Sequence, residues 1–340
     1  MNPSRLPARI AALPKAELHL HLEGSIQPST VCALTAQHAI ELTEEEVRRR
    51  YSYTDFLGFI DAFKWVTSFL REPRDYALIA HDLAEHLLTQ NVIYAEVTLS
   101  VGIMLLRRQQ PEANFAAILR ATEPFEKRGL RFNWIFDAVR QFGPEPAMDV
   151  VNVAKQCASD RIVAFGIGGD ELSIATHEFR PVYERAAEHG LHLLMHAGEV
   201  GGPEKIREAV ELLRVERIGH GIAAAQDPAL MDLLADRRIP LEVCPQSNLC
   251  TGALEKHLRA RNAIGDSQRA TIEQHPLPQL LRHGIPIVLS TDDPAMFHTT
   301  LLAEYENAAH MGLSENELLQ LSNASFDHAF RPSRNAILGA

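Results

Sequence analysis

Short apolar segments rich in β-branched residues recur along the chain, and stretches with helical periodicity, such as 74–91 and 203–214, separate most of them. Strand and helix alternating eight times predict an α/β fold, a parallel (β/α)8 TIM barrel. An open doubly wound sheet is the alternative, but no G-x-G-x-x-G follows the first strand, so a dinucleotide site has no support. The eight predicted strands are 17–22, 92–100, 131–139, 162–168, 191–196, 217–221, 240–245 and 285–291.

The connection between the first two predicted strands is the exception to this regular spacing. It has roughly seventy residues, far more than one crossover helix needs. Within it, segment 52–70 carries aromatic residues at helical spacing. We expect one barrel domain over 1–340, with 52–70 as a helical lid over the active site; plain helical packing is the alternative.

Composition narrows the class of protein. The chain has 340 residues, of which 46% are hydrophobic, and a formal net charge of −11. This acidity argues against nucleic acid or an anionic membrane as a partner and leaves a small molecule. The four cysteines form no C-x-x-C pair, and we find no signal-peptide pattern and no apolar run of spanning length. We therefore expect a cytoplasmic protein.

Imidazole and carboxylate side chains gather where four of the predicted strands end. In a parallel barrel the carboxyl ends of all strands meet at one face, where catalytic groups collect. A single strand histidine is usually a packing residue and Asp-Asp-Pro is often a turn, but their joint placement favours an active site. The residues are His19 and His21 on the first strand, His196 and Glu199 at the end of the fifth, His220 at the end of the sixth, and Asp292 and Asp293 at the end of the eighth.

The histidine spacing indicates a metal site. Residues i and i+2 of a strand share one face, so His19 and His21 can reach one ion. His196 and Asp292 can complete its coordination. We expect one Zn²⁺, with Fe²⁺ or Mn²⁺ as alternatives, and bound zinc lowers the pKa of a water ligand to about 7. Glu199 and His220 are then left as the acid and base that a hydrolase needs.

Five ordered motifs carry a resemblance to a known family. PKAELHLHLEGS, HAGE, RIGHGI, CPQSN and STDDP together resemble the adenosine deaminase family of the amidohydrolase superfamily, and the similarity runs from Pro14 to about Phe330. The resemblance implies hydrolytic deamination of a 6-aminopurine, with a 6-oxopurine and ammonia as products. It assigns the metal ligands as above and adds a catalytic role for Asp292.

The resemblance also implies roles around the purine ring. Glu199 protonates ring N1, and His220 orients and helps deprotonate the water. Asp293 hydrogen-bonds N7, and the backbone N–H of Gly169 meets N3. Protonated Glu199 requires a raised pKa, which burial supplies.

Departures from the adenosine pattern bear on the substrate. Glu23 stands where adenosine deaminases have the aspartate that contacts the ribose 5′ hydroxyl. Arg140 is a candidate partner for an anionic 5′ extension, with Lys64 as a second candidate and a structural ion pair as the plainer role for Arg140. The motifs DAVRQFG, GIGGDE and AFKWVTSFL are similar to the aminodeoxyfutalosine deaminase branch, whose substrate is a menaquinone precursor with a benzoate at the 5′ side. Adenosine and free adenine stay open as substrates.

Two other classes compete with a deaminase. A barrel that only binds a purine or a partner would have lost a metal ligand position, and none is lost. A phosphotriester or amide hydrolase of related type often needs a carboxylated lysine on the fourth strand, and 162–168 contains no lysine. One metal ion is therefore favoured over two.

Overall fold

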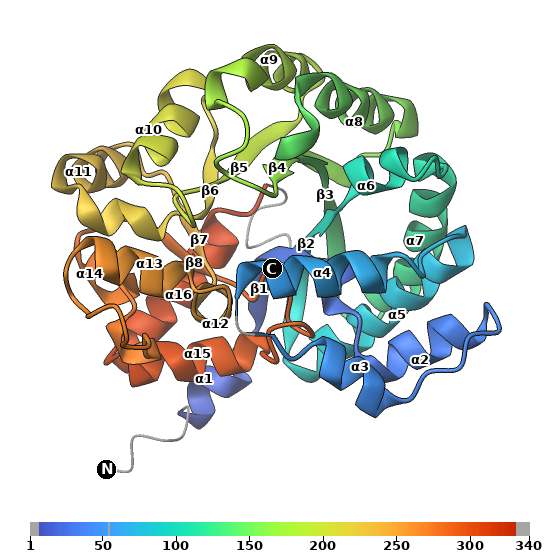
Figure 1. Cartoon of the computed structure of the whole chain (residues 1–340), viewed down its shortest axis with the longest axis horizontal. Coiled ribbons are helices and arrows are strands. Elements are labelled where there is room, and N and C mark those ends of the chain that lie inside the picture. The colour runs from blue at the N-terminus through green and yellow to red at the C-terminus, as the bar shows by residue number, and fades with distance from the viewer. Residues whose placement is uncertain (1–6, 54, 331–340) are drawn as a thin grey trace.

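In the computed structural model, which describes residues 7–53 and 55–330, eight parallel strands pair in chain order around a central axis (Figure 1). An isolated parallel bridge between Leu20 and Asp292 joins the first strand to the chain after the last one. The predicted TIM barrel is thus confirmed, although the seventh and eighth strands are shorter than expected. The strands are β1 (Lys15–His21), β2 (Val92–Leu99), β3 (Arg131–Val139), β4 (Ile162–Gly168), β5 (His192–Ala197), β6 (Arg217–His220), β7 (Leu241–Val243) and β8 (Ile287–Leu289).

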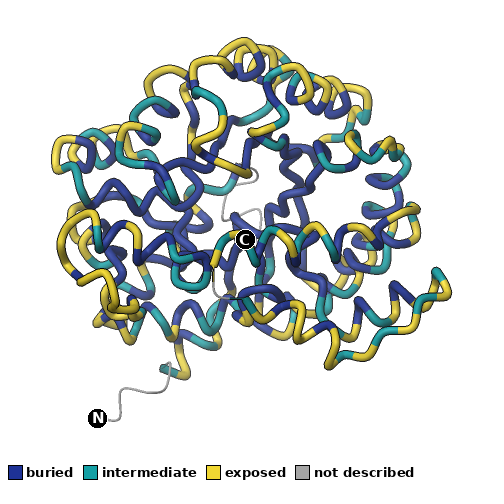
Figure 2. The backbone as a smooth tube through the Cα atoms, in the orientation of Figure 1, coloured by how far each residue is buried: buried dark blue, intermediate teal, exposed yellow. Residues whose placement is uncertain are grey.

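Helices surround the strands. In Figure 2 the sides of the helices that face the strands are largely buried (dark blue), and their outer sides are largely exposed (yellow). None of the described helices has the length and apolar character that a membrane span requires. The helices are α1 (Ala8–Ala12), α2 (Pro28–Ala36), α3 (Glu44–Arg50), α4 (Phe56–Thr67), α5 (Pro73–Thr89), α6 (Val101–Leu106), α7 (Pro111–Glu126), α8 (Pro144–Cys157), α9 (Arg180–Glu188), α10 (Pro203–Leu212), α11 (Pro228–Asp236), α12 (Pro245–Cys250), α13 (Ala253–Ala260), α14 (Leu277–Arg282), α15 (Leu301–His310) and α16 (Glu315–Asp327).

The interior of the barrel contains buried charged groups. Arg217 of β6 lies 2.7 Å from Glu96 of β2, and these strands are not neighbours in the sheet, so the pair crosses the interior. A second carboxylate, Glu242 of β7, accepts a hydrogen bond from Arg217 Nε at 2.5 Å. A buried guanidinium between two carboxylates is compensated, whereas removing one partner would leave an unpaired charge.

The end of the described chain closes the barrel beneath these charges. The Phe330 side chain packs against Val163, at the start of β4, and against Leu194. Its ring lies 3.6 Å from the Arg217 guanidinium, and its backbone N–H donates to Glu96 at 2.6 Å. The chain after α16 therefore holds the interior charges in place from the side opposite the carboxyl ends of the strands.

The long connection between β1 and β2 contains four helices, and α4 crosses the carboxyl face of the barrel (Figure 1). Asp55 caps the start of α4 by accepting from the Gly58 N–H at 2.9 Å. At its other end, the Arg107 guanidinium donates to the Thr67 carbonyl and to Thr67 Oγ1. Segment 52–70 is thus mainly helical and lies over the site; that it opens and closes as a lid stays a prediction.

Candidate active site

Three histidines and one aspartate meet at the carboxyl ends of the strands. One ligand atom from each of His19, His21, His196 and Asp292 lies within 4.8 Å of the others. Asp292 Oδ1 is 3.3 Å from His19 Nε2 and 3.2 Å from His21 Nε2. Ligands bonded at about 2.0–2.1 Å to a tetrahedral ion lie about 3.3 Å apart. The cluster therefore fits a divalent metal ion bound through nitrogen and oxygen, as the strand spacing predicted.

Two buried charged residues, Glu242 and Arg217, form a hydrogen-bonded series that ends on His19; we call it the charged relay. His19 Nδ1 lies 2.7 Å from Glu242 Oε2, and the other oxygen of Glu242 is paired with Arg217. Burial opposes ionisation of Glu242, but the charges of Arg217 and His19 outweigh it and hold the pKa of this carboxyl below its ordinary value. A carboxylate that receives Nδ1–H orients the imidazole and leaves Nε2 for the metal. A Cβ on Gly219 would lie 2.8 Å from His19 Cε1, so a glycine is needed beside the ring.

Glu199 and His220 lie on one side of the metal cluster. His220 Nε2 is 3.6 Å from Glu199 Oε2 and 3.9 Å from Asp292 Oδ2. Burial, followed by the charges of Asp292 and Glu171, raises the pKa of Glu199 to about 8. His220 and Asp292 have φ values of 62° and 67°, a left-handed conformation that non-glycine residues rarely adopt. Strained backbone at both positions is typical of a functional site.

The loop after β5 is fixed by Glu171, a residue that sequence reasoning did not single out. Its carboxylate accepts the backbone N–H groups of Gly198, Val200 (2.9 Å) and Gly201 (2.7 Å). These three bonds determine where Glu199 stands. The motif GIGGDE contains Glu171, but nothing in the sequence indicates that its partner is a loop thirty residues further on.

Asp293 and Gly169 are the residues that the resemblance expects to contact the purine ring. Both line the cavity. A Cβ on Gly24 would lie 1.7 Å from Asp293 Oδ1, so the glycine makes room for this carboxyl. Burial and the neighbouring charge of Asp292 raise the pKa of Asp293 well above its ordinary value. Gly169 has φ +96°, which favours glycine.

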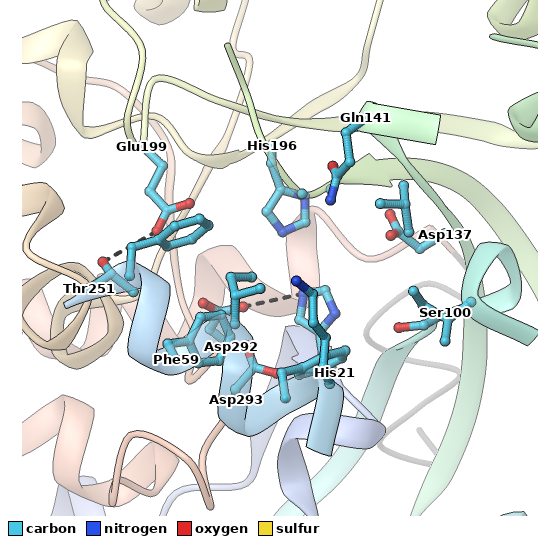
Figure 3. A pocket seen from close by; sticks show the side chains of 18 of the residues that line it. His21, Phe59, Ser100, Asp137, Gln141, His196, Glu199, Thr251, Asp292 and Asp293 are labelled. Atoms are coloured by element: carbon cyan, nitrogen blue, oxygen red, sulfur yellow. Dashed lines mark hydrogen bonds and ion pairs between the residues drawn. The ribbon is translucent and has the colours of Figure 1, made fainter. Parts of the chain in front are cut away.

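A cavity of about 290 Å³ opens from the metal cluster toward α4. Its inner wall is polar, and Figure 3 shows Glu199 and Thr251 on one side of His196 with Asp137 and Ser100 on the other. Sequence reasoning did not single out Asp137, although its side chain lies on the face of β3 that is turned toward the barrel interior. The outer wall is mostly apolar and consists of Phe56, Phe59, Ile60, Phe63, Ile103, Val139 and Phe142, with Lys64 and Gln141 beside them.

Two predicted substrate contacts are not among the lining residues. The Glu23 carboxyl is buried behind Ser100 and accepts its backbone N–H at 3.1 Å. Burial raises the pKa of Glu23 to about 7. Arg140 is also buried, and its Nη2 donates to the His196 carbonyl at 3.1 Å. The structure thus differs from the expected contact between Arg140 and a carboxylate: the guanidinium turns inward and supports the backbone of His196.

Lys64 is the cation that does line the cavity. Its side chain is exposed, and none of the ion pairs within residues 7–53 and 55–330 involves it. Arg107, which caps the end of α4, holds the helix that carries Lys64 in place. An unpaired ammonium beside aromatic side chains provides a site for an anion on a flat, apolar group.

Comparisons with known proteins agree with this geometry. The family model for adenosine deaminase matches residues 14–338. An aminodeoxyfutalosine deaminase of Streptomyces coelicolor is 38% identical over 335 residues, which is 96% of this chain and 83% of the relative. An adenine deaminase of Chelativorans sp. is 32% identical over 318 residues, 93% of each chain. The crystal structure of an adenine deaminase from Arthrobacter aurescens has a TM-score of 0.86 at 29% identity, covering 96% of this chain and 97% of that one.

The barrel, the His–Asp cluster and these relatives define a metal-dependent hydrolytic deaminase. More narrowly, the chain belongs to the adenosine deaminase family. Relatives that act on aminodeoxyfutalosine and relatives that act on adenine both match it over nearly its whole length.

Proposed function

We propose that the protein is a zinc-dependent hydrolytic deaminase of a 6-aminopurine nucleoside with a carboxylated aromatic group at its 5′ end, as in aminodeoxyfutalosine. The cavity carries this proposal, because it continues beyond the metal cluster to the aromatic face of α4, where Lys64 is unpaired in the described chain. A free base would leave that outer part empty. The 38% identity to an aminodeoxyfutalosine deaminase supports the same choice.

His19, His21, His196 and Asp292 would hold the zinc ion; Fe²⁺ or Mn²⁺ suits the same donors. When bound, zinc supplies the nucleophile by lowering the pKa of a water molecule to about 7. The four ligands come from three strand ends of a rigid barrel, which fixes their geometry before substrate arrives.

The other residues act on the purine. Protonated Glu199 donates to ring N1, which makes C6 more electrophilic; its raised pKa keeps the proton available. Oxygen from water bonds to C6 and the C6–N bond breaks. One proton of the water goes to the departing amine and the other restores Glu199, so the products are ammonia and a 6-oxopurine. Ring N7 is an acceptor, so Asp293 must be protonated to bond it, in agreement with the raised pKa of that carboxyl. Gly169 meets N3 through its backbone N–H.

At the 5′ end, the aromatic residues of α4 would pack against the aromatic group and Lys64 would pair with its carboxylate. This places the carboxylate on the lid helix rather than at Arg140. Because the 5′ carboxylate takes no part in the reaction at C6, its contact with Lys64 would stabilise the bound substrate and the transition state equally, and we expect it to affect KM more than kcat.

Lys64→Gln tests this assignment. We expect KM for aminodeoxyfutalosine to rise about tenfold, equivalent to about 1.4 kcal/mol, with KM for adenosine unchanged. Lys127→Gln, an exposed lysine outside the cavity, is the matched control and should change neither value. Equal rises in KM for both nucleosides would contradict a carboxylate contact.

Adenine is the second candidate substrate. Several adenine deaminases are 30–32% identical to the chain. The family resemblance also implies a glutamate at the position of Glu23 in adenine deaminases. An enzyme for the free base would use only the inner, polar half of the cavity. Replacing Lys64 would then have no effect on its activity.

A further inference from the structure

A neutral chain of hydrogen bonds reaches the active site from α14 and ends on His220. The Leu277 backbone N–H donates to His275 Nδ1 at 3.1 Å. His275 Nε2 lies 3.2 Å from Asn248 Oδ1, and Asn248 Nδ2 lies 3.0 Å from His220 Nδ1. All four residues are buried, so water does not compete for these bonds.

The backbone amide sets the direction of this chain. An amide N–H can only donate, so His275 Nδ1 must accept and carry no proton. A neutral imidazole has one proton, which is therefore on Nε2 and is donated to Asn248 Oδ1. A protonated His275 would set its Nδ1–H against the Leu277 N–H. Burial, the largest cause, lowers the pKa of His275 to about 3, in agreement with the neutral form.

The orientation of the Asn248 amide follows from His275. With Oδ1 accepting from His275, Nδ2 faces His220 and donates to its Nδ1. Turning the amide over would set Asn248 Nδ2–H against His275 Nε2–H and leave buried donors unpaired, which is costly. The two ends of an asparagine amide are ordinarily assigned from their surroundings, and here a main-chain donor decides the assignment.

We propose that Asn248 and His275 are positioning residues that hold neutral His220 in the tautomer with its proton on Nε2. That nitrogen faces the side of the site where Glu199 and Asp292 lie, at 3.6 and 3.9 Å. His220 therefore meets the attacking water as a hydrogen-bond donor, and in the resting enzyme it directs no lone pair toward it. The family resemblance implies that His220 orients the water and helps to deprotonate it. This tautomer leaves only the orienting role.

The catalytic part of this inference rests on the proposed function, whereas the tautomer does not, so the test reads the tautomer without substrate. In the zinc-loaded full chain labelled with ¹⁵N-histidine, the ring nitrogens of His220 are assigned by their loss in His220→Gln. We expect the nitrogen-15 shift of Nε2 at the protonated position and that of Nδ1 at the unprotonated one. The reverse pattern would overturn the proposal, whatever the substrate is.

Asn248→Asp replaces the amide donor by a carboxylate and should reverse the direction of the hydrogen bond to His220. A carboxylate still accepts from His275 Nε2–H, but it cannot donate to His220, so it requires a proton on His220 Nδ1. We expect the Nδ1 signal to move to the protonated position and kcat to fall at least about tenfold while KM changes less than about twofold, because a wrong imidazole tautomer impairs the chemical step. An unmoved Nδ1 signal would contradict the relay. An inverted tautomer with unchanged kcat would contradict the donor role.

Gln226→Glu is the matched control. Gln226 Nε2 lies 2.6 Å from His257 Nδ1, so the same exchange of amide for carboxylate is made at another amide–imidazole pair. The His220 signals should stay where they are in the wild-type protein. If they moved as in Asn248→Asp, the change would reflect added negative charge rather than the hydrogen-bond chain, and the proposal would fail.

Discussion

Two hydrogen-bonded relays stand behind the active site, and they differ in charge. Behind His19, Glu242 and Arg217 form an ionised chain that crosses the barrel interior. Behind His220, Asn248 and His275 form a chain of neutral groups that starts at a backbone amide. An anionic partner makes an imidazole a stronger metal ligand, whereas a neutral donor leaves it uncharged with its proton on the far nitrogen. The same side chain is thus given two different roles by what lies behind it.

The largest difference is expected in stability. Arg217→Met leaves Glu96 and Glu242 buried without their cation, which should lower the free energy of unfolding by about 3–5 kcal/mol. Chemical denaturation of the zinc-loaded protein measures this. A loss below 1 kcal/mol would show that the charged relay does not differ from ordinary neutral packing.

The next difference concerns metal binding. Glu242→Gln removes the carboxylate that orients His19, and we expect zinc affinity to fall about 10–100-fold in competition with a chelator. Glu304→Gln is the control, since Glu304 is a buried carboxyl bonded to Thr299 and outside the relay. Unchanged zinc affinity in Glu242→Gln would mean that the relay does not act on the metal.

Breaking the neutral relay should affect stability without affecting the metal. His275→Phe leaves the Leu277 N–H and Asn248 Oδ1 unpaired, at a cost of about 1–3 kcal/mol. Zinc affinity should stay within about twofold of wild type, since His220 is not one of the four ligands. A drop as large as that of Glu242→Gln would remove the distinction between the two relays.

The smallest effect is one of pH. Glu199 acts in its protonated form, and its pKa is raised to about 8 by burial first and by Asp292 second. Since a raised pKa keeps an acid protonated up to that pH, kcat/KM should be steady below it and fall about tenfold per unit above it. In Glu199→Gln, activity should be low at every pH and this alkaline limb should be absent. A limb that persists in the variant would come from another group.

Sequence reasoning reached the metal site because strand geometry is local: His19 and His21 share a face whatever surrounds them. It did not reach Glu242, which lies inside β7 and contacts His19 only because the closed barrel brings these two non-neighbouring strands within side-chain reach. Asn248 and His275 were missed for a similar reason, because their hydrogen-bonded order depends on two contacts between separate segments, Asn248 to His275 and Asn248 to His220. These links come from tertiary packing.

The direction of long side chains was the other feature that the sequence could not predict. Arg140 and Lys64 were both placed near the mouth by their positions after β3 and within segment 52–70. The structure turns Arg140 inward, where the His196 carbonyl needs a donor, and leaves Lys64 at the cavity. A long cationic side chain can take either course from the same backbone position, so its contacts follow from its surroundings.

The most direct test of the function is a comparison of kcat/KM for aminodeoxyfutalosine, adenosine and adenine with the zinc-loaded protein, measured as ammonia release. We expect a preference of about a hundredfold or more for aminodeoxyfutalosine, equivalent to about 2.7 kcal/mol in transition-state binding. A similar preference for adenine would contradict it and assign the outer half of the cavity to something other than substrate recognition.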